Sequence, residues 1–425
     1  MSTDAPARPL GLFEGYGVEL EYMIVRRADL SVAAITDQLL AQVVGEISSD
    51  FENGVISWSN ELALHVVEIK TSDPAAALDP LPKLFQENVR KINGELAGLG
   101  ARLMPSAMHP WMDPHTEMKL WPHDNSPIYE AFNRVFDCTG HGWANLQSVH
   151  LNLPFKNDAE FARLHAAIRL ILPLLPALAA SSPIVDGKLT GLMDNRLEVY
   201  RHNARKIPSI SGRVIPEAVF DKQSYEQQIF QKIYADIAPH DPDGTLQHEW
   251  LNARGAIARF DRNAIEIRVL DVQECPQADL AICAAIVEVL RALVDEHWTP
   301  LSEQKSFSTE SLEQSFLASV RDADEAIIQD ARFLRQFGYP IGGNATNVQV
   351  SMHDLWKWLL DSLGLFHGKL EAAWGEPLRV IAQHGPLARR IVRTLHGDTS
   401  RAKLAQVYGE LADCLQDGKV FVGHE

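Results

Sequence analysis

The amino-acid sequence predicts an α+β fold, and three observations support this. Residues 17–25 and 264–273 alternate β-branched or aliphatic residues with other side chains, which is typical of β-strands. Helical spacing alternates with further strand-like segments as far as about residue 276. From Gln277 onward the pattern is almost entirely helical. We therefore expect a sheet domain over residues 1–276 and a helical region over residues 277–425 that packs on this domain and does not fold alone.

The separate elements follow from the same patterns and from helix-capping signals. Asn157 followed by Glu160 is typical of a capping box, which predicts that a helix begins there. Two irregular segments, 108–126 and 186–216, are long enough to suggest binding loops. Strands are expected at 17–25, 62–69, 102–107, 148–153 and 264–273. Helices are expected at 29–47, 81–99, 278–297, 311–337, 351–363, 370–384 and 401–416.

Composition excludes several classes of function. The 39 Lys and Arg residues against 56 Asp and Glu residues give a formal net charge of −17. Such a charge repels nucleic acids and anionic membranes, and no basic stretch opposes it, so neither is an expected partner. The four cysteines are scattered without a CxxC pair, which favours a reducing cytoplasmic setting. The most apolar run, 170–180, contains two prolines and is too short to span a bilayer, so it predicts a buried helix end.

Charged residues occupy one face of two predicted strands. Alternation places Glu19 and Glu21 together on the first strand, and Glu266 and Arg268 together on the last. Unpaired charges on a sheet face that meets a core are costly, so these groups must be paired, hydrated or bound to cations. The pattern therefore predicts a metal–phosphate site built on a sheet.

Two more segments extend this set. His150 and Asn152 share one face of their strand, opposite its aliphatic residues. Glu61 and Glu68 are separated by seven positions, an odd number that would place them on opposite faces of a regular strand. We expect Glu61 to lie in the preceding loop, from where both carboxylates reach one site. Several glutamates with one histidine suit Mg²⁺ or Mn²⁺ better than structural zinc.

These residues resemble the glutamate–cysteine ligase family, in the branch called carboxylate–amine ligases. The family's opening GVE-x-E strand is similar to residues 17–21, and its closing E-[IV]-R strand with a following Asp is similar to residues 266–271. The acidic segment 61–68, the strand of His150 and the loop 196–216 also resemble the family. The sequence has no P-loop, Rossmann glycine motif, GxSxG elbow or HExxH helix, so any ATP site has another architecture.

The resemblance implies a glutamine-synthetase-like fold, in which a curved, largely antiparallel sheet holds divalent metals and ATP. It implies an ATP- and Mg²⁺-dependent ligase that converts a carboxylate, usually the γ-carboxylate of glutamate, to an acyl phosphate and then to an amide. By position, Arg268 and Glu266 are the catalytic residues, with Arg268 stabilising the transferred phosphoryl group. By position, the metal ligands are Glu19, Glu21, Glu61, Glu68, His150 and Glu266.

Five further arginines are candidates for anion binding, and several questions stay open at this level. Arg254 and Arg259 are candidates for phosphate contacts beside Arg268, and Arg196, Arg201 and Arg213 compete for the substrate carboxylate. Cysteine, polyamines and other amines are all open as acceptors, and a homodimer is expected from the apolar helices. Two alternatives to the ligase are a metal-dependent hydrolase on the same fold and a non-catalytic metabolite-binding relative.

Overall fold

A sheet of eight strands forms the centre of the fold, which confirms the predicted α+β architecture with a largely antiparallel sheet. The computed structural model describes residues 8–342 and 347–423. Seven strands follow the order β2-β3-β4-β1-β6-β10-β9, β5 also pairs with β1, and all these pairs are antiparallel. The strands are β1 (Gly17–Arg26), β2 (Asp50–Asn53), β3 (Ile56–Asn60), β4 (Val66–Thr71), β5 (Ala101–Met104), β6 (Ser148–Pro154), β9 (Ala256–Arg259) and β10 (Ala264–Asp271).

The two faces of the sheet differ in chemistry. Cross-strand partners lie on the same face, and the register pairs Glu19 with His150 and Glu21 with Glu68. The alternation of β1 therefore continues across its neighbours and produces one charged face. The opposite face carries fully buried apolar side chains, among them Val18, Leu20, Tyr22, Val67 and Leu151.

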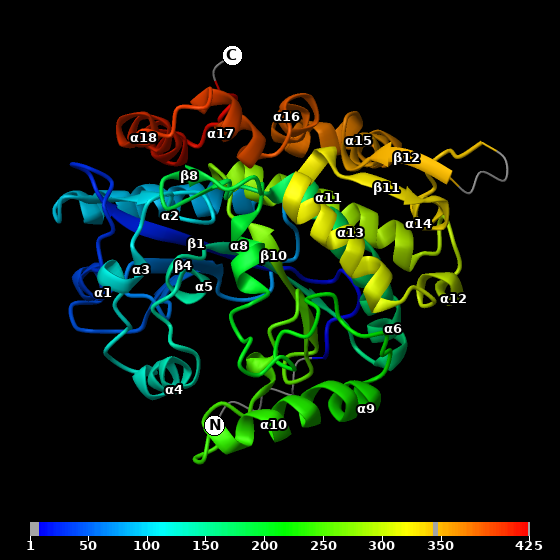
Figure 1. The fold of residues 1–425 in the computed structure, drawn as a ribbon, viewed down its shortest axis with the longest axis horizontal. Coiled ribbons are helices and arrows are strands. Elements are labelled where there is room, and N and C mark those ends of the chain that lie inside the picture. The colour runs from blue at the N-terminus through cyan, green and yellow to red at the C-terminus, as the bar shows by residue number, and fades with distance from the viewer. Residues whose placement is uncertain (1–7, 343–346, 424–425) are drawn as a thin grey trace.

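Long helices cover the apolar face. In Figure 1, α2 and α11 lie on one side of the sheet, and α4 and α10 lie beyond its other side. Among the described residues, no helix is both long and apolar enough to cross a bilayer. The longer helices are α1 (Thr36–Val44), α2 (Leu81–Ala97), α4 (Ser126–Phe136), α6 (Asp158–Ile171), α11 (Pro276–Val294), α13 (Thr309–Asp322), α15 (Met352–Ser362), α16 (Gly368–His384), α17 (Leu387–Leu395) and α18 (Arg401–Asp417). Shorter helices include α3 (Pro114–Glu117), α5 (His141–Ala144), α7 (Pro176–Ala179), α8 (Asn195–Tyr200), α9 (Lys222–Tyr225), α10 (Gln231–Ile237), α12 (Leu301–Gln304) and α14 (Ala331–Arg335).

The predicted cap of α6 forms in part. The side chain of Asn157 accepts a hydrogen bond from the backbone N–H of Glu160 at 3.0 Å. The Glu160 carboxylate accepts from the N–H groups of Lys156 and Leu12 instead of that of Asn157, so the reciprocal half of the box is replaced by a contact to the N-terminal segment. The apolar run 170–180 is buried at the end of α6 and through α7, as predicted.

Several boundaries differ from the sequence prediction. The helix expected at 311–337 ends at Asp322, and β11 (Ile327–Asp330) then pairs with β12 (Asn347–Ser351). The helix expected at 29–47 begins only at Thr36, because Leu30 adopts a positive φ of 57° in a turn after β1. The strand expected at 62–69 begins at Val66, and β2, β3 and α4 were not predicted. Short polar strands such as β2 lack a strong apolar period, which explains why they were missed.

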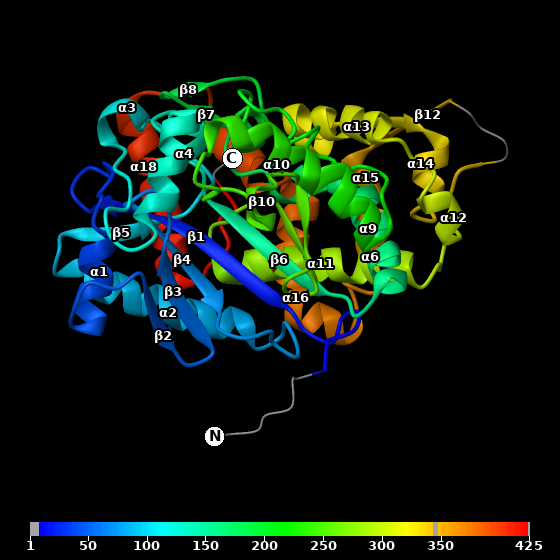
Figure 2. The same ribbon diagram turned by 90° about the horizontal axis from the view of Figure 1, so that it is seen from below.

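The C-terminal helices pack directly on the sheet domain. The helix α11 follows β10 and packs against α2 and α6, and Figure 2 shows α11, α16 and α2 beneath the strands. Arg90 of α2 donates to the carbonyl oxygens of Gln416 and Asp417 at the end of α18. The side chains of Glu274 and Arg390 are fully buried and form an ion pair between the end of the sheet and α17. These contacts support the proposal that the helical region does not fold alone.

Candidate active site

The charged side chains meet because they occupy neighbouring positions in the register. Lys70, Glu19 and His150 form one row across β4, β1 and β6, and Glu68 and Glu21 form the adjacent row. The strand β10 adds Glu266, which pairs with Asn152 of β6. All these side chains point to the same face of the sheet.

His150 and Glu19 form the central ion pair. Nδ1 of His150 lies 2.9 Å from Oε2 of Glu19, and Nε2 lies 3.0 Å from Oγ of Ser148. Nδ2 of Asn152 donates to Oε1 of Glu19 at 3.0 Å. Burial opposes charge on both members of the pair, but their mutual hydrogen bond and attraction prevail. The pKa of His150 rises to about 9 and the pKa of Glu19 falls far below its ordinary value, so both are charged at neutral pH.

Glu68 extends the site toward β3. Its carboxylate accepts a hydrogen bond from Oγ of Ser59 at 2.8 Å and pairs with the ammonium group of Lys70. Burial, together with the negative charge of Glu19, raises the pKa of Glu68 to about 7 although Lys70 opposes the shift. The positive charge nearby is therefore too small to balance the carboxylates.

Glu61 reaches the same place from a loop. It follows β3 and precedes β4, as its odd spacing from Glu68 predicts. Burial and the charges of Glu68 and Glu21 raise the pKa of Glu61 well above its ordinary value. Glu21 is itself fixed by Ser148, whose backbone N–H and hydroxyl donate to Oε2 at 2.7 and 2.9 Å.

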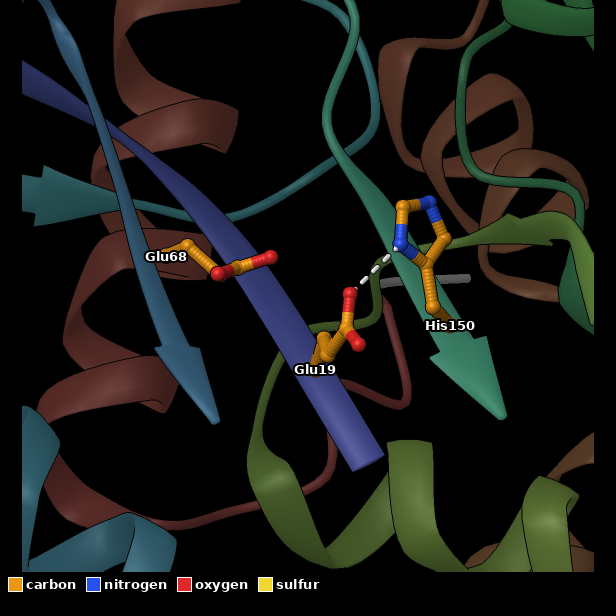
Figure 3. Close-up of side chains that lie close together, drawn as sticks. All are labelled: Glu19, Glu68 and His150. Carbon is orange, nitrogen blue, oxygen red and sulfur yellow. Dashed lines mark hydrogen bonds and ion pairs between the residues drawn. The ribbon is translucent and has the colours of Figure 1, made fainter. Parts of the chain in front are cut away.

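Two groups of these side chains have the composition of a site for a hard cation. One ligand atom from each of Glu19, Glu68 and His150 lies within 4.8 Å of the others, and the same holds for Glu21, Glu61 and Glu68. Figure 3 shows the first group, contributed by three adjacent strands. The raised pKa values of Glu61 and Glu68 indicate negative charge that the protein does not balance. The donor set therefore fits Mg²⁺ or Mn²⁺.

Glu266 lies between two arginines on the other side of His150. Its Oε1 is 2.9 Å from Nε of Arg268 and 3.8 Å from Nδ1 of His150, and its Oε2 is 3.7 Å from Nη1 of Arg259. Arg259 also donates to the Asp261 carboxylate through two nitrogens, at 3.2 and 3.0 Å. The two guanidinium groups place positive charge beside the carboxylate clusters, where a phosphate would meet both.

A bulge in β10 positions another arginine. Arg268 and Val269 lie where the register shifts, so two residues oppose His150 of β6. The carbonyl oxygen of Arg268 accepts a hydrogen bond from Nη2 of Arg196 at 2.8 Å, and Nη1 of Arg196 lies 3.5 Å from Oδ1 of Asp271. Arg196 is only 2% exposed, and its Nε has no hydrogen-bond partner. The bulge thus holds one of the three predicted substrate arginines close to the site.

Two adjoining cavities open onto the charged face. The polar cavity, of about 660 Å³, is lined by residues that include Glu19, Glu68, Lys70, Asn152, Arg259 and Glu266. The aromatic cavity, of about 320 Å³, is lined by residues that include Arg196 and five rings, those of Tyr129, Phe132, Trp143, Tyr200 and Trp250. Both are lined by Glu21, Glu61, His150, Trp250 and Arg268. The junction of the two cavities is therefore the candidate reacting centre.

Three of the predicted arginines, Arg201, Arg213 and Arg254, are not brought to this centre. None of them is among the described residues that line either cavity. Each is paired with a carboxylate of its own: Arg201 with Glu198, Arg213 with Glu313, and Arg254 with Glu217. We therefore leave these three out of the proposal below.

Sequence reasoning missed some residues that the fold brings to the site. Lys70 and Ser148 lie two positions from Glu68 and His150, so strand alternation alone contained the signal for both. The aromatic wall has no comparable signal, because its rings come from four elements, α4, α5, α8 and the turn Glu249–Leu251, that are spread over residues 126–251. Only the folded structure brings them together.

The model of glutamate-cysteine ligase family 2 matches residues 16–330, from the start of β1 to the end of β11. The chain belongs to this family. The matched region contains the whole eight-stranded sheet, every described lining residue of the aromatic cavity, and those of the polar cavity except Pro9, Leu10 and Gly15. The resemblance inferred from the strand motifs is thereby confirmed, and the protein is a member of a ligase family.

Individual relatives support this membership. A protein of Archaeoglobus fulgidus, whose name states no function, is 35% identical over 280 residues, which cover 66% of this chain and 75% of its own. A protein of Cupriavidus metallidurans, provisionally named glutamate–cysteine ligase 2, is 27% identical over 296 residues, which cover 66% and 68%. The solved glutamate–cysteine ligase of Francisella tularensis, in complex with AMP, has a TM-score of 0.56 and 10% identity over 96% of this chain and 90% of its own. That last likeness shows the fold alone.

Proposed function

We propose that the protein is an ATP-dependent carboxylate–amine ligase whose first candidate substrate is glutamate, activated at its γ-carboxylate. The observation that carries this proposal is the junction of two cavities at Glu21, Glu61, His150 and Arg268. A ligase must bring a nucleotide, a carboxylate and an amine to one reacting centre, and two joined cavities provide separate approaches to it. Membership of a ligase family supports the reaction class.

The proposed chemistry has two steps. A carboxylate oxygen of the substrate bonds to the γ-phosphorus of ATP as the bond to the β,γ-bridging oxygen breaks and ADP leaves. The amine nitrogen then bonds to the acyl carbon, loses a proton, and phosphate leaves with the electrons of the broken C–O bond. Phosphoryl transfer depends on positioning and charge neutralisation, which is the role we assign to Arg268 and Arg259. Glu266, which lies against both, holds them in place.

The carboxylate clusters are proposed to hold Mg²⁺ or Mn²⁺ through Glu19, Glu21, Glu61, Glu68, His150 and Glu266. A bound divalent cation neutralises phosphate charge during transfer. The protein's own part is to fix the ligands: Ser148 orients Glu21, Asn152 orients Glu19 and Ser59 orients Glu68. Because these partners are held by the strands, the ligands are positioned before any cation binds.

Arg196 is the proposed receptor for a carboxylate of the substrate. Its unpartnered Nε belongs to a nearly fully buried side chain that lines the aromatic cavity. Asp271 and the carbonyl oxygen of Arg268 hold the other nitrogens.

The four free cysteines suit a reducing cytoplasm, which we propose as the setting. A homodimer stays a prediction, to be checked by light scattering.

Hydroxylamine trapping tests this proposal without knowledge of the acceptor. Purified protein, ATP, Mg²⁺ and glutamate are mixed with hydroxylamine, which converts an acyl phosphate to a hydroxamate that can be measured by its iron complex. Hydroxamate and ADP formation that both require glutamate would support the ligase. Phosphate release from ATP without glutamate would favour the metal-dependent hydrolase, and nucleotide binding without turnover would favour a metabolite-binding protein.

A further inference from the structure

The aromatic cavity has walls that carboxylate activation does not need. Tyr129 and Phe132 come from α4, Trp143 from α5, Tyr200 from α8, and Trp250 from the turn Glu249–Leu251. Three of the rings form a connected surface, since the centroid of Phe132 lies 5.2 Å from that of Trp143 and 5.8 Å from that of Trp250. Figure 2 shows α4 beside the strands, away from α2 and α11. This surface is built for an apolar or aromatic group.

The cavity has two chemically different ends. The charged side chains among its described lining residues are Glu21, Glu61, His150, Arg196 and Arg268, all at or next to the junction with the polar cavity. Its other described lining residues are neutral. A ligand that fills the cavity therefore places its reacting group at the charged end and an uncharged body at the aromatic end.

The amine fits the aromatic end better than the carboxylate substrate does. An amino acid such as glutamate carries an ammonium and a carboxylate group on its α-carbon. These charged groups match the charged end of the cavity, where Arg196 keeps an unpartnered nitrogen. The amino group of the other substrate, bound as an ammonium ion until it gives up the proton that frees its lone pair, would arrive beside Glu21 and Glu61. Aromatic faces also attract cations. Its remaining atoms then have only the ring-lined part of the cavity to occupy.

The size of the cavity argues against cysteine as the preferred acceptor. Even with part of its volume of about 320 Å³ taken by glutamate at Arg196, the cavity has more ring-lined wall than the small –CH2SH side chain of cysteine can cover. Nε1 of Trp143 and Oη of Tyr200 are buried without a hydrogen-bond partner, which leaves a polar atom of a larger ligand two places to bind. A small acceptor would leave these groups and most of the apolar wall unused.

We propose that the acceptor is a primary amine with an apolar or aromatic body larger than the cysteine side chain. This inference rests on the proposed ligase function, because it names the substrate class of the same site. The product is an N-substituted amide of the activated carboxylate, formed with loss of phosphate and of one proton from the amine. The aromatic rings select the acceptor by the apolar surface that they bury.

A series of amines tests the inference with wild-type protein. ADP release and product mass are measured at saturating ATP, Mg²⁺ and glutamate with ethylamine, butylamine, 2-phenylethylamine, glycine and cysteine. We expect kcat/KM to rise at least about tenfold from ethylamine to 2-phenylethylamine, and the latter to exceed cysteine. If kcat/KM does not change along the amine series, or if cysteine is the best acceptor, this inference is overturned. Hydroxamate formation in the same preparation would still support the ligase. Absence of hydroxamate as well would refute the ligase and this inference together.

A filled cavity provides the second test. Phe132→Trp adds volume to the wall and should lower the ratio of kcat/KM for 2-phenylethylamine to that for hydroxylamine by at least about fivefold. Phe366→Trp makes the same change at a half-buried phenylalanine in the C-terminal region, away from both cavities, and should leave the ratio unaltered. An unchanged ratio in Phe132→Trp would show that this wall does not contact the acceptor.

Discussion

Nδ1 of His150 lies 2.9 Å from Oε2 of Glu19, and the two residues are direct partners in the antiparallel register of β6 and β1. The sheet itself therefore fixes this pair, without help from a loop. His150 balances only one of the carboxylates around it, and Lys70 balances part of another. The remaining negative charge is the physical basis of the cation site proposed above.

Divalent cations should stabilise the folded protein without any substrate. A cation present at 100 times its Kd adds about 2.7 kcal/mol to the free energy of unfolding. Mn²⁺ or Mg²⁺ should therefore raise Tm in a thermal melt, and EDTA should reverse the rise. Glu68→Gln should weaken the apparent affinity at least about tenfold, because it removes one charged oxygen from both ligand groups. Glu46→Gln, at an exposed position after α1, is the matched control, and equal Tm shifts in both variants would contradict the metal site.

Substitution at Glu266 and Arg268 should separate activity from folding. Glu266→Gln keeps the shape of the side chain but removes the charge that faces Arg268 and Arg259, so we expect hydroxamate formation to fall by at least about 100-fold. Arg268→Lys should lose most activity too, because lysine lacks the planar fork. Circular dichroism and Tm report whether the fold is kept. Activity close to wild type in folded Glu266→Gln would remove Glu266 from the site.

Acid should destabilise the protein through buried His165. Its ring stacks on Phe161 at 5.1 Å, and burial, with the nearby charge of Arg169, lowers its pKa to about 3. An unfolded histidine titrates near about 6.5, so between these pH values only the unfolded state binds the proton. Stability therefore falls as pH drops from about 6.5, with a slope of up to about 1.4 kcal/mol per pH unit from this residue.

Urea unfolding at about pH 7.5 and about pH 5 measures that slope. His165→Phe should show a smaller loss of stability on acidification than wild type, whatever its stability at neutral pH. His240→Phe changes an exposed histidine and should keep the wild-type loss. Parallel losses in wild type and His165→Phe would assign acid sensitivity to other groups.

The buried pair of Glu274 and Arg390 should hold the two regions together. Nη1 of Arg390 lies 2.6 Å from Oε1 of Glu274, and neither side chain is exposed. Arg390→Met leaves the carboxylate buried without its partner, which should cost about 3–5 kcal/mol. The double variant Glu274→Leu/Arg390→Met should regain most of that loss. A single cooperative unfolding transition in all variants is expected, and separate transitions would mean that residues 277–425 fold independently.

Strand alternation was enough to predict the charged face. Glu19, Glu21, Glu266 and His150 were each predicted on the correct side of a strand, because a period of two follows directly from backbone geometry. The loop position of Glu61 was also predicted from its spacing. These predictions depended on local geometry and on the cost of placing charges against a core.

Long-range contacts could not be predicted in the same way. The arginines Arg196 and Arg213 look equivalent in a polar loop, yet one is held by Asp271 and the other pairs with an exposed helix. Their difference depends on residues that are far away in the sequence. The hairpin of β11 and β12 was missed for a similar reason, since its two strands are separated by residues 331–346.

The bulge at Arg268 and Val269 changes which face of the sheet the later residues of β10 occupy. Glu266 and Asp271 are five positions apart, an odd number, yet their partners Asn152 and Ser148 lie on one face of β6. In an unbroken strand, Asp271 would point into the apolar core and could not hold Arg196. A chain with one residue fewer between Glu266 and Asp271 would keep both carboxylates on that face but would lose the bulge, where the carbonyl oxygen of Arg268 accepts a hydrogen bond from Arg196. The length of this motif therefore determines how Arg196 is held, while strand alternation determines where the carboxylates point.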